Sequence, residues 1–277
     1  MKADLVKNLS VCIVIRNEEI FIDRCLSSLG ELADEILVVH DGECTDASLE
    51  ICKNYKAKIF VRKFLGNAEP HRAWIYEKAE SEWILQLDAD EFLSDELRQA
   101  IPTLVKDKMA ACYEFLCPYW NGKQYVTKNW PWIKRLFRKS SIKYLAIPHE
   151  EVKAQGKIIR LPLCIHHQPN HDNFSWQSFV TKHRRTAKVH ARFFLEDKKN
   201  WEKFPAGDQS LLPHYYVLAK HDLLVAPFIF VYHMAASLAY GAIWEGFYGW
   251  RNAFLFSLYY LVMAYEIRSL KKNVQNI

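Results

Sequence analysis

The chain has 277 residues, half of them hydrophobic, which suits one large domain or one domain with an appendage. Its net charge of +5 is too small to indicate a nucleic-acid-binding protein, although it is compatible with phosphate ligands or with an anionic membrane face. The seven cysteines are odd in number, scattered and without a Cys-x-x-Cys pair, which favours free thiols in a reducing, cytoplasmic location. Residues 1–4 carry no apolar signal segment.

The chain up to residue 91 alternates between apolar segments typical of strands and segments with helical spacing of apolar residues. Strands are predicted over residues 9–16, 35–40, 58–61 and from residue 83. Asn17 is suited to cap the first helix, and Pro70 fits the first turn of a helix over residues 69–79. The order β-α-β-α-β-α-β predicts an α/β protein that has a parallel sheet with helices on both faces.

Three carboxylates follow the fourth predicted strand, in the run Asp88-Ala89-Asp90-Glu91. Open α/β sheets bind ligands at the carboxyl ends of their strands, and two carboxylates with phosphate oxygens suit Mg²⁺ or Mn²⁺. The alternative is a solvated acidic loop that leads into a helix. The chain lacks Gly-x-Gly-x-x-Gly after the first strand and lacks Gly-x-x-x-x-Gly-Lys, which disfavours the dinucleotide-binding and P-loop versions of this architecture.

Several motifs follow one another at the spacing found in family 2 glycosyltransferases, which the chain resembles over about residues 9–170. The motifs are Ser10–Glu19, Ala33–Val39, Asp41–Asp46 and Trp83–Glu91. The chain looks most like the branch similar to lipopolysaccharide-core glycosyltransferases. That branch has the Asn-Glu-Glu start, the Trp-Ile-Leu-x-Leu-Asp-Ala-Asp-Glu strand, an Arg-Leu-Phe-Arg and a later His-Glu, all of which are present here.

The resemblance implies a GT-A fold, which is Rossmann-like with a mostly parallel sheet, over residues 1–172. It also implies a metal-dependent, inverting glycosyltransferase. The enzyme would move a sugar from a nucleotide-diphosphate donor, and we expect a lipid-linked or cell-envelope saccharide as the acceptor because the C-terminal region suits a membrane. Asp88 and Asp90 are then expected to hold Mg²⁺ or Mn²⁺ on the donor diphosphate.

The donor site departs from the family pattern at one turn. Where Asp-Asp-Gly-Ser is usual, this chain has His40-Asp41-Gly42-Glu43-Cys44, and Asp41 is our choice for the side chain that meets the nucleotide base. Arg135 and Arg138 of the Arg-Leu-Phe-Arg motif are suited to clamp phosphate, or are simply two exposed basic residues on a strand. The full set expected to bind the donor is Asn17, Glu18, Asp41, Arg72, Asp88, Arg135 and Arg138.

The run Ile147-Pro148-His149-Glu150-Glu151 is the second chemical landmark. Inverting transfer needs a base that takes the proton of the attacking hydroxyl group. By resemblance, Glu150 is expected to be this base, with His149 beside it and Glu151 as the second choice. A surface acidic turn is the alternative.

The histidines of His166-His167-x-x-x-His171 invite a metal assignment. Zinc usually requires further ligands at defined spacing, and none is clear. In some glycosyltransferases of this fold a late histidine completes the metal site, and His166 is expected at that position. A structural histidine is the alternative.

The region 173–277 is expected to be helical, first amphipathic and then strongly apolar. Residues 173–205 interleave basic and apolar side chains, which suits an anionic membrane surface or an ordinary surface helix. Residues 223–244 contain no Asp, Glu, Lys or Arg and reach the span of a bilayer core, roughly 20 residues. After an interruption over 245–252, a second apolar run covers 253–265.

We therefore expect two helices embedded in, or lying on, the cytoplasmic leaflet of the cell membrane, with a homo-oligomer as an option. Buried helices of a soluble subdomain are the alternative. Two other functions remain open from the sequence: a sugar-phosphate nucleotidyltransferase, disfavoured by the missing Gly-rich start, and a non-catalytic carbohydrate-binding scaffold on the membrane.

Overall fold

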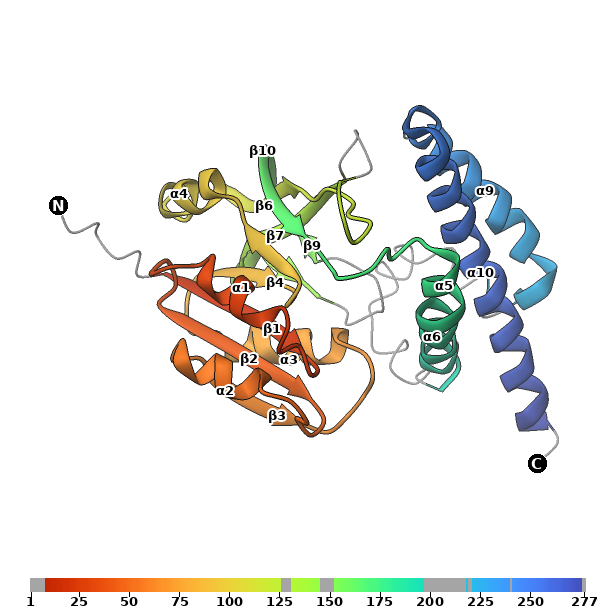
Figure 1. Ribbon diagram of the computed structural model, residues 1–277, viewed down its shortest axis with the longest axis horizontal. Coiled ribbons are helices and arrows are strands. Elements are labelled where there is room, and N and C mark those ends of the chain that lie inside the picture. Colours follow the sequence, from red (N-terminus) through yellow and green to blue (C-terminus); the bar gives the residue numbers. More distant parts are fainter. Residues whose placement is uncertain are drawn as a thin grey trace. The chain divides into compact units, whose positions relative to one another are not determined.

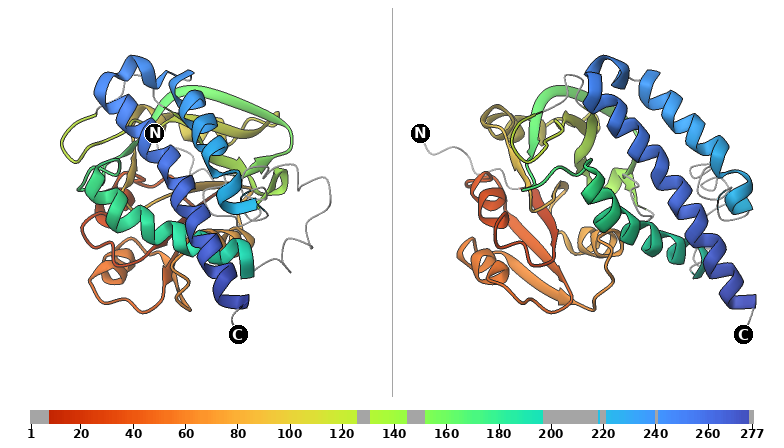
Figure 2. Two further views of the ribbon diagram at one scale, coloured as in Figure 1. Left: turned by 90° about the vertical axis from the view of Figure 1, so that its right-hand side faces the viewer. Right: turned by 45° about the vertical axis from the view of Figure 1, so that its right-hand side comes forward.

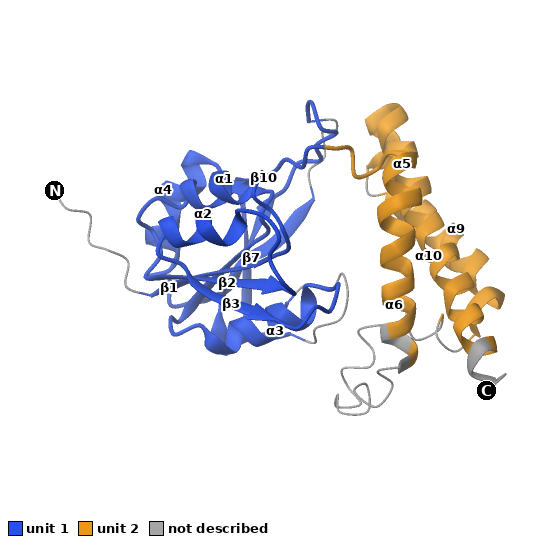
Figure 3. Cartoon of the chain, turned by 60° about the horizontal axis from the view of Figure 1, so that its bottom comes forward, with its two compact units in different colours: residues 1–125, 130–170 blue, residues 126–129, 171–277 orange. Residues whose placement is uncertain are grey.

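The computed structural model describes residues 8–125, 131–144, 152–196, 218, 221–239 and 241–275. The chain divides into two compact units, which are coloured separately in Figure 3. Unit 1 comprises residues 1–125 and 130–170, and unit 2 comprises residues 126–129 and 171–277.

Unit 1 is built on a mixed sheet, to which eight strands of the described residues belong, in the order β3-β2-β1-β4-β7-β6-β10-β5 (Figure 1). The strands are β1 (Leu9–Ile15), β2 (Glu35–Asp41), β3 (Lys58–Arg62), β4 (Trp83–Leu87), β5 (Glu91–Leu93), β6 (Ala110–Leu116), β7 (Trp132–Arg138) and β10 (Lys157–His167). The first four are mutually parallel and β10 is parallel to β6, whereas β7 and β5 run antiparallel to their neighbours. The prediction of a mostly parallel α/β sheet is confirmed.

Helices cover both faces of this sheet, as predicted. They are α1 (Ile22–Ser27), α2 (Ser48–Asn54), α3 (Glu69–Lys78) and α4 (Asp95–Leu104). Successive residues of a strand point to opposite faces, so Val11 and Ile13 pack in the core beneath α1 and α2, whereas Cys12 packs beside Ile75 of α3. A short helix, η1 (Lys139–Ser141), and a two-stranded ribbon of β8 (Ile142–Lys143) and β9 (Lys153–Ala154) complete the described part of unit 1.

The start of α1 differs from the prediction. The helix begins at Ile22, and Asn17 is not its cap. Asn17 has a φ of 54°, in the left-handed region that asparagine tolerates better than most residues, whereas a residue that caps a helix with its side chain typically has an extended backbone. Its side-chain amide instead bonds to Thr45, with Asn17 Nδ2 donating to Thr45 Oγ1 at 2.8 Å and Asn17 Oδ1 accepting from the Thr45 peptide at 3.0 Å.

Unit 2 is helical throughout its described residues. Its elements are α5 (Trp176–Ser178), η2 (Phe179–His183), α6 (Arg184–Glu196), η4 (Asp222–Leu224), α9 (Ala226–Ala239), η5 (Ala242–Glu245) and α10 (Gly246–Gln275). Helix α10 packs against both α6 and α9 (Figure 2). None of the described helices is by itself both long enough and apolar enough to cross a membrane. Ala226–Ala239 and Ala242–Lys272 qualify only together, as a pair bent by 71°.

The interruption that the sequence predicted over residues 245–252 is shorter in the structure, because η5 ends at Glu245 and α10 begins at Gly246 and takes in the remaining residues. The chain turns before α10. The φ values there are 114° at Gly241 and 59° at Gly246, and a residue with a side chain would be strained at either angle. A Cβ on Gly249 would lie 1.9 Å from the carbonyl oxygen of Ala242. The glycines therefore shape a tight turn between α9 and α10 and do not end the helix.

Candidate active site

The acidic turn, residues 88–91, lies at the carboxyl end of β4, which is flanked by β1 and β7 in the sheet. It is closed on itself, since the Glu91 peptide donates to Asp88 O at 3.0 Å and the Asp88 peptide donates to Glu91 Oε2 at 3.0 Å. Cys25 of α1 lies beneath it, with Sγ 3.5 Å from Asp88 O. The buried apolar residues of β4 therefore deliver this turn to the edge where α/β sheets bind ligands.

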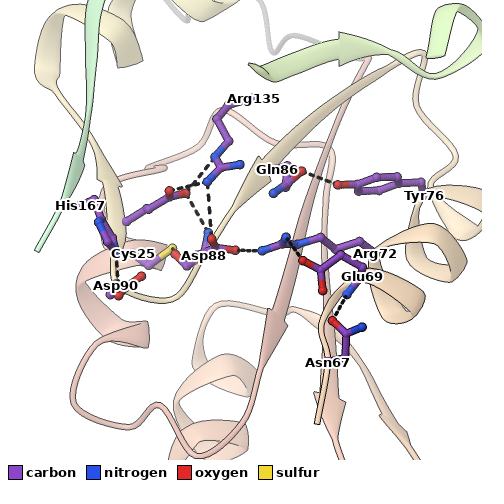
Figure 4. A network of polar contacts seen from close by, with 11 residues as sticks. Cys25, Asn67, Glu69, Arg72, Tyr76, Gln86, Asp88, Asp90, Arg135 and His167 are labelled. Carbon is purple, nitrogen blue, oxygen red and sulfur yellow. Dashed lines mark hydrogen bonds and ion pairs between the residues drawn. The ribbon is translucent and has the colours of Figure 1, made fainter. Parts of the chain in front are cut away.

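Two arginines converge on Asp88 from different elements (Figure 4). Arg72 of α3 donates from Nη2 to Asp88 Oδ1, and its Nη1 is 3.7 Å from Glu69 Oε1. Arg135 of β7 approaches Asp88 Oδ2 at 3.5 Å. Burial alone raises the pKa of Asp88, but the charges of Arg72 and Arg135 outweigh it and lower that pKa to about 2. Asp88 is therefore ionised at neutral pH.

Arg135 also pairs with Glu91. Its Nη2 donates to Glu91 Oε1 at 2.6 Å and its Nε to Glu91 Oε2 at 3.1 Å, which is a bidentate arrangement. Both groups are buried, and burial raises the pKa of Glu91 by more than the neighbouring Arg135 lowers it. Glu91 thus fixes Arg135 between the two carboxylates.

Asp90 contacts a histidine, His167, which is the last residue of β10. His167 Nε2 lies 3.0 Å from Asp90 Oδ2. Burial lowers the pKa of His167, but the hydrogen bond and the charge of Asp90 exceed that effect and raise it above its usual value. The pairing depends on the register of β10 against β5, which sets His167 opposite Glu91.

His166, which was the expected metal ligand, is not brought to the carboxylates. It is opposite Phe92 in the strand register and stacks on that ring at 4.9 Å, and its Nδ1 is 2.5 Å from the hydroxyl of Tyr125. Neighbouring residues of a strand point to opposite faces, so only one of the two histidines can face Asp90. The structure therefore places His167, and not His166, beside Asp90.

No group of three or more His, Cys, Asp and Glu side chains within the described ranges is arranged to hold a metal ion by itself. The chemistry of Asp90 and His167 nevertheless fits such an ion, because a carboxylate oxygen and an imidazole nitrogen lie side by side. Mg²⁺ and Mn²⁺ commonly bind through one or two protein ligands together with water and substrate phosphates. Asp90 with His167 is thus the pair suited to this role, whereas both oxygens of Asp88 face arginine.

Asp41, which was expected to contact the nucleotide base, is buried, and its carboxylate is hydrogen-bonded to other parts of unit 1. It is 5% exposed, and its carboxylate accepts from the peptides of Leu65 at 2.6 Å and Gly66 at 2.8 Å and from His71 Nε2 at 2.8 Å. Three donors on one buried carboxylate fix the loop around residue 65. The structure therefore gives Asp41 a positioning role in that loop.

Asn17 and Glu18 lie in the loop after β1, next to the turn that follows β2. The Asn17 peptide donates to His40 Nε2 at 3.2 Å, and His40 Nδ1 donates to Gly42 O at 2.9 Å, which identifies the neutral tautomer. The Glu18 peptide donates to Ser48 Oγ at 2.6 Å. The histidine that replaces the usual acid thus joins the two loops.

Arg138 does not belong to the site. It is opposite Trp83 in the strand register, at the start of β4, whereas the acidic turn follows the end of that strand. Its guanidinium donates to Ala110 O at 2.8 Å and to Asp107 O, and pairs with Glu82. The structure therefore does not support a phosphate-clamping role for Arg138, which lies three positions beyond Arg135 on β7 and opposite the start of β4.

His149, Glu150 and Glu151 lie outside the described residues. The residues that flank them are described on both sides. The Tyr144 ring lies 5.2 Å from the ring of Tyr76, whose hydroxyl donates to Gln86 of β4 at 2.5 Å, and Val152 is buried in the same cluster as Ile84 of β4. The chain therefore leaves and re-enters the described structure close to β4.

The model of the family described as glycosyl transferase family 2 matches residues 10–157. An uncharacterized glycosyltransferase of Rickettsia typhi is 36% identical over 96 residues, which are 35% of this chain and 32% of the relative. The lipopolysaccharide core biosynthesis glycosyltransferase LpsC of Rhizobium meliloti is 30% identical over 129 residues, 44% of this chain and 46% of that protein. The matched part thus spans a third to a half of these relatives.

Solved structures are similar at low sequence identity. S. aureus TarS residues 1–349 in complex with UDP-GlcNAc has a TM-score of 0.46 and 14% identity, and the match covers 96% of this chain and 92% of that one. Glucosyl-3-phosphoglycerate synthase from Mycobacterium tuberculosis, in complex with phosphoglyceric acid, has a TM-score of 0.46 and 14% identity over 66% of this chain and 78% of that one.

Proposed function

The chain belongs to glycosyl transferase family 2, and from that premise we propose that it transfers a sugar from a nucleotide-diphosphate donor to a lipid-linked or cell-envelope saccharide. One observation carries the proposal: Asp88, Asp90, Arg72, Arg135 and His167 converge at the carboxyl end of β4. This edge is where open α/β sheets bind nucleotides. The similarity to a lipopolysaccharide core glycosyltransferase supports the acceptor class.

Arg72 and Arg135 bind the donor diphosphate in this proposal. Three clustered carboxylates alone would repel a phosphate, and the two arginines offset that charge. A guanidinium has five N–H donors in a fixed fork, so an arginine that holds Asp88 retains donors for phosphate oxygens. Asp88 and Glu91 orient these two cations, and Glu69 contacts Arg72 from within α3.

Asp90 and His167 would hold Mg²⁺ or Mn²⁺. When bound, such an ion supplies positive charge that stabilises the nucleoside diphosphate as it leaves. The protein contributes the position of the carboxylate, which the closed turn of residues 88–91 fixes, and the position of the imidazole, which the β5–β10 register fixes.

Glu150 acts as the base, with His149 beside it. The acceptor oxygen attacks the anomeric carbon, the bond from that carbon to the phosphate oxygen breaks, and the hydroxyl proton passes to the Glu150 carboxylate. A single displacement of this kind inverts the anomeric configuration. The assignment rests on the resemblance of the His149-Glu150 run to the family motif.

We also place the reaction at the cytoplasmic face of the cell membrane, because a lipid-linked acceptor and a soluble nucleotide sugar meet there. The free thiols of all seven cysteines are compatible with this reducing compartment.

The test is a product assay on the purified chain with a panel of nucleotide sugars, Mn²⁺ and an envelope saccharide fraction. Glycosyl transfer releases a nucleoside diphosphate, whereas nucleotidyl transfer releases pyrophosphate. Asp90→Asn should lower the rate by about 10²–10³-fold while leaving the circular dichroism spectrum unchanged. The matched control is Asp95→Asn, which removes a largely exposed carboxylate at the start of α4.

Full activity of Asp90→Asn refutes the metal assignment. Release of pyrophosphate replaces the proposal with nucleotidyl transfer. The absence of binding to every nucleotide sugar in the presence of Mn²⁺ identifies a non-catalytic scaffold.

A further inference from the structure

Unit 2 exposes many large apolar side chains along α9, in the turn after it and in the first half of α10. Phe228, Trp244 and Phe247 are 76%, 77% and 75% exposed. We call this set the outer apolar face, and its members are Leu224, Phe228, Val231, Tyr232, Ile243, Trp244, Phe247, Trp250 and Phe254. On a helix of a soluble domain the outward stripe is normally polar, whereas α9 is apolar on its exposed side as well as on its buried side.

The spacing shows that these residues share one side of each helix. On α9, Phe228 is followed by Val231 and Tyr232, and on α10 Phe247 is followed by Trp250 and Phe254. Residues three, four and seven apart lie on the same helix face. Ile229 of α9 and Leu255 of α10, each one position beyond a member of the face, are buried. The outer apolar face is therefore distinct from the packed interior of unit 2.

The net positive charge of the protein resides in the same part of the chain. Residues 171–277 contain 13 Lys and Arg against 8 Asp and Glu, a net charge of +5, whereas residues 1–170 contain 24 of each and are neutral. The segment from η2 to α6 presents a row of exposed basic residues. These are Lys182, Arg184, Arg185, Lys188 and Arg192. Since α6 packs on α10, one unit carries both the apolar face and this basic row.

The composition of the face also suits the boundary between lipid and water. Residues 223–244 contain no charged side chain, and the face is rich in Trp, Tyr and Phe, the rings that concentrate at headgroup level in membranes. Basic side chains beside such a face gain from the negative potential of anionic lipids.

We propose that unit 2 docks on an anionic phospholipid surface, with the outer apolar face entering the headgroup region and the basic row held near the lipid phosphates. Charge favours lipid over a second copy of the chain as the occupant, because a second copy would bring together two 171–277 segments that each carry +5. The purpose of the docking, to bring the enzyme to a lipid-linked acceptor, rests on the proposed function. Lipid binding itself is measured without turnover.

The test is co-sedimentation of the full chain with vesicles of phosphatidylglycerol and phosphatidylcholine, compared with vesicles of phosphatidylcholine alone. We expect binding to the anionic vesicles that weakens at 0.5 M NaCl, where charges are screened within a few ångströms. The double substitution Phe228→Gln with Trp244→Gln should lower the partition coefficient at least tenfold. The matched control, Ile20→Gln with Met109→Gln, changes two residues of unit 1 that are 72% and 74% exposed, and should bind like the wild type.

A second pair of substitutions, Arg185→Gln with Arg192→Gln, should reduce binding to anionic vesicles and its salt dependence. The absence of wild-type binding to anionic vesicles overturns the proposal, as does equal binding by the Phe228→Gln/Trp244→Gln variant. Light scattering tests whether a second copy covers the face instead. If the wild type is a dimer, and the variant is a monomer that binds vesicles as the wild type does, the face belongs to a second copy and the lipid proposal is overturned. Vesicle binding without sugar transfer leaves the docking surface intact and rejects the proposed function alone.

Discussion

The three carboxylates after β4 differ in the partners that hold them. Asp88 faces two arginines, which stay charged at any pH that proteins encounter, and Glu91 shares one of them. Asp90 instead pairs with His167, an imidazole that can lose its proton and become a neutral ligand. This difference makes Asp90 the carboxylate best suited to exchange its partner for a divalent cation, and Asp88 the one best suited to orient the arginines.

The two neighbouring histidines allow a direct test of this division. His167→Ala should raise the Mn²⁺ concentration needed for half-maximal activity by at least about tenfold, since it removes the side chain beside Asp90. His166→Ala should leave that concentration unchanged, because His166 contacts Phe92 and Tyr125. A Mn²⁺ titration of nucleoside diphosphate release measures both. A larger effect from His166→Ala would restore the assignment made from the sequence.

The two arginines of β7 provide a second matched pair. Arg135→Lys keeps the charge but loses the bidentate contact with Glu91, and should lower kcat/KM by about tenfold or more because the phosphate-binding fork is gone. Arg138→Lys loses the contacts with Ala110 O and Asp107 O and should lower thermal stability with kcat/KM preserved. Steady-state kinetics and thermal denaturation of both variants distinguish the roles. Equal kinetic losses would contradict the placement of Arg138 outside the site.

At the scale of elements, one buried carboxylate connects three strands of unit 1. Glu35, the first residue of β2, accepts hydrogen bonds from Ser10 of β1 at 2.5 Å, from Lys58 of β3 at 2.8 Å and from the Glu80 peptide before β4 at 2.6 Å. Burial raises the pKa of Glu35, but the bonds from Lys58, Ser10 and Glu80 exceed it and the pKa is lowered. The carboxylate therefore stabilises the parallel part of the sheet in its ionised form.

Because the folded-state pKa of Glu35 is lowered, its contribution to stability is present above the pKa of the unfolded chain, about 4.3. The contribution is lost as the pH falls below that value through the folded-state pKa. Glu35→Gln should lower the free energy of unfolding by ~1–2 kcal/mol at pH 7, and the difference from the wild type should shrink below about pH 4. Urea denaturation at the two pH values checks this. A difference that grows on acidification contradicts the sign.

At the scale of the whole molecule, charge and chemistry are divided between the units. Unit 1 holds the acidic turn and its arginines, and residues 1–170 are neutral overall. Unit 2 holds the basic row, the outer apolar face and all of residues 171–277, which carry the net charge of +5. This division underlies the two proposals made above, donor binding by unit 1 and docking of unit 2 on anionic lipid.

Donor binding should be visible as stabilisation of the folded protein. A nucleotide sugar at 100 times its Kd should add about 2.7 kcal/mol to the free energy of unfolding, and more with Mn²⁺ present than with a chelator. A thermal-shift screen of nucleotide sugars measures this, with the free sugars as the control. A melting temperature that no nucleotide sugar raises in the presence of Mn²⁺ would contradict a donor site.

Much of unit 1 was predictable from the sequence because the signals are local. Apolar β-branched runs mark β1 and β2, and the acidic run that begins at Asp88 marks the end of β4. Their order along the chain is enough to predict a parallel sheet, since short helical connections leave no other simple arrangement. The motifs around Asp88 and Asp90 also carried the resemblance to family 2, which the family model confirms.

The partners of these residues depended on register between distant strands, which no local pattern encodes. A shift of one residue decides that His167 and not His166 faces Asp90, because side chains alternate across a strand. The pairing of β7 with β4 likewise separates Arg135 from Arg138, and the contacts of Asp41 come from a loop 24 residues away. The sequence by itself thus determined the sheet and its acidic edge, whereas only the tertiary structure decided which side chains meet there, because those contacts join residues far apart in the chain.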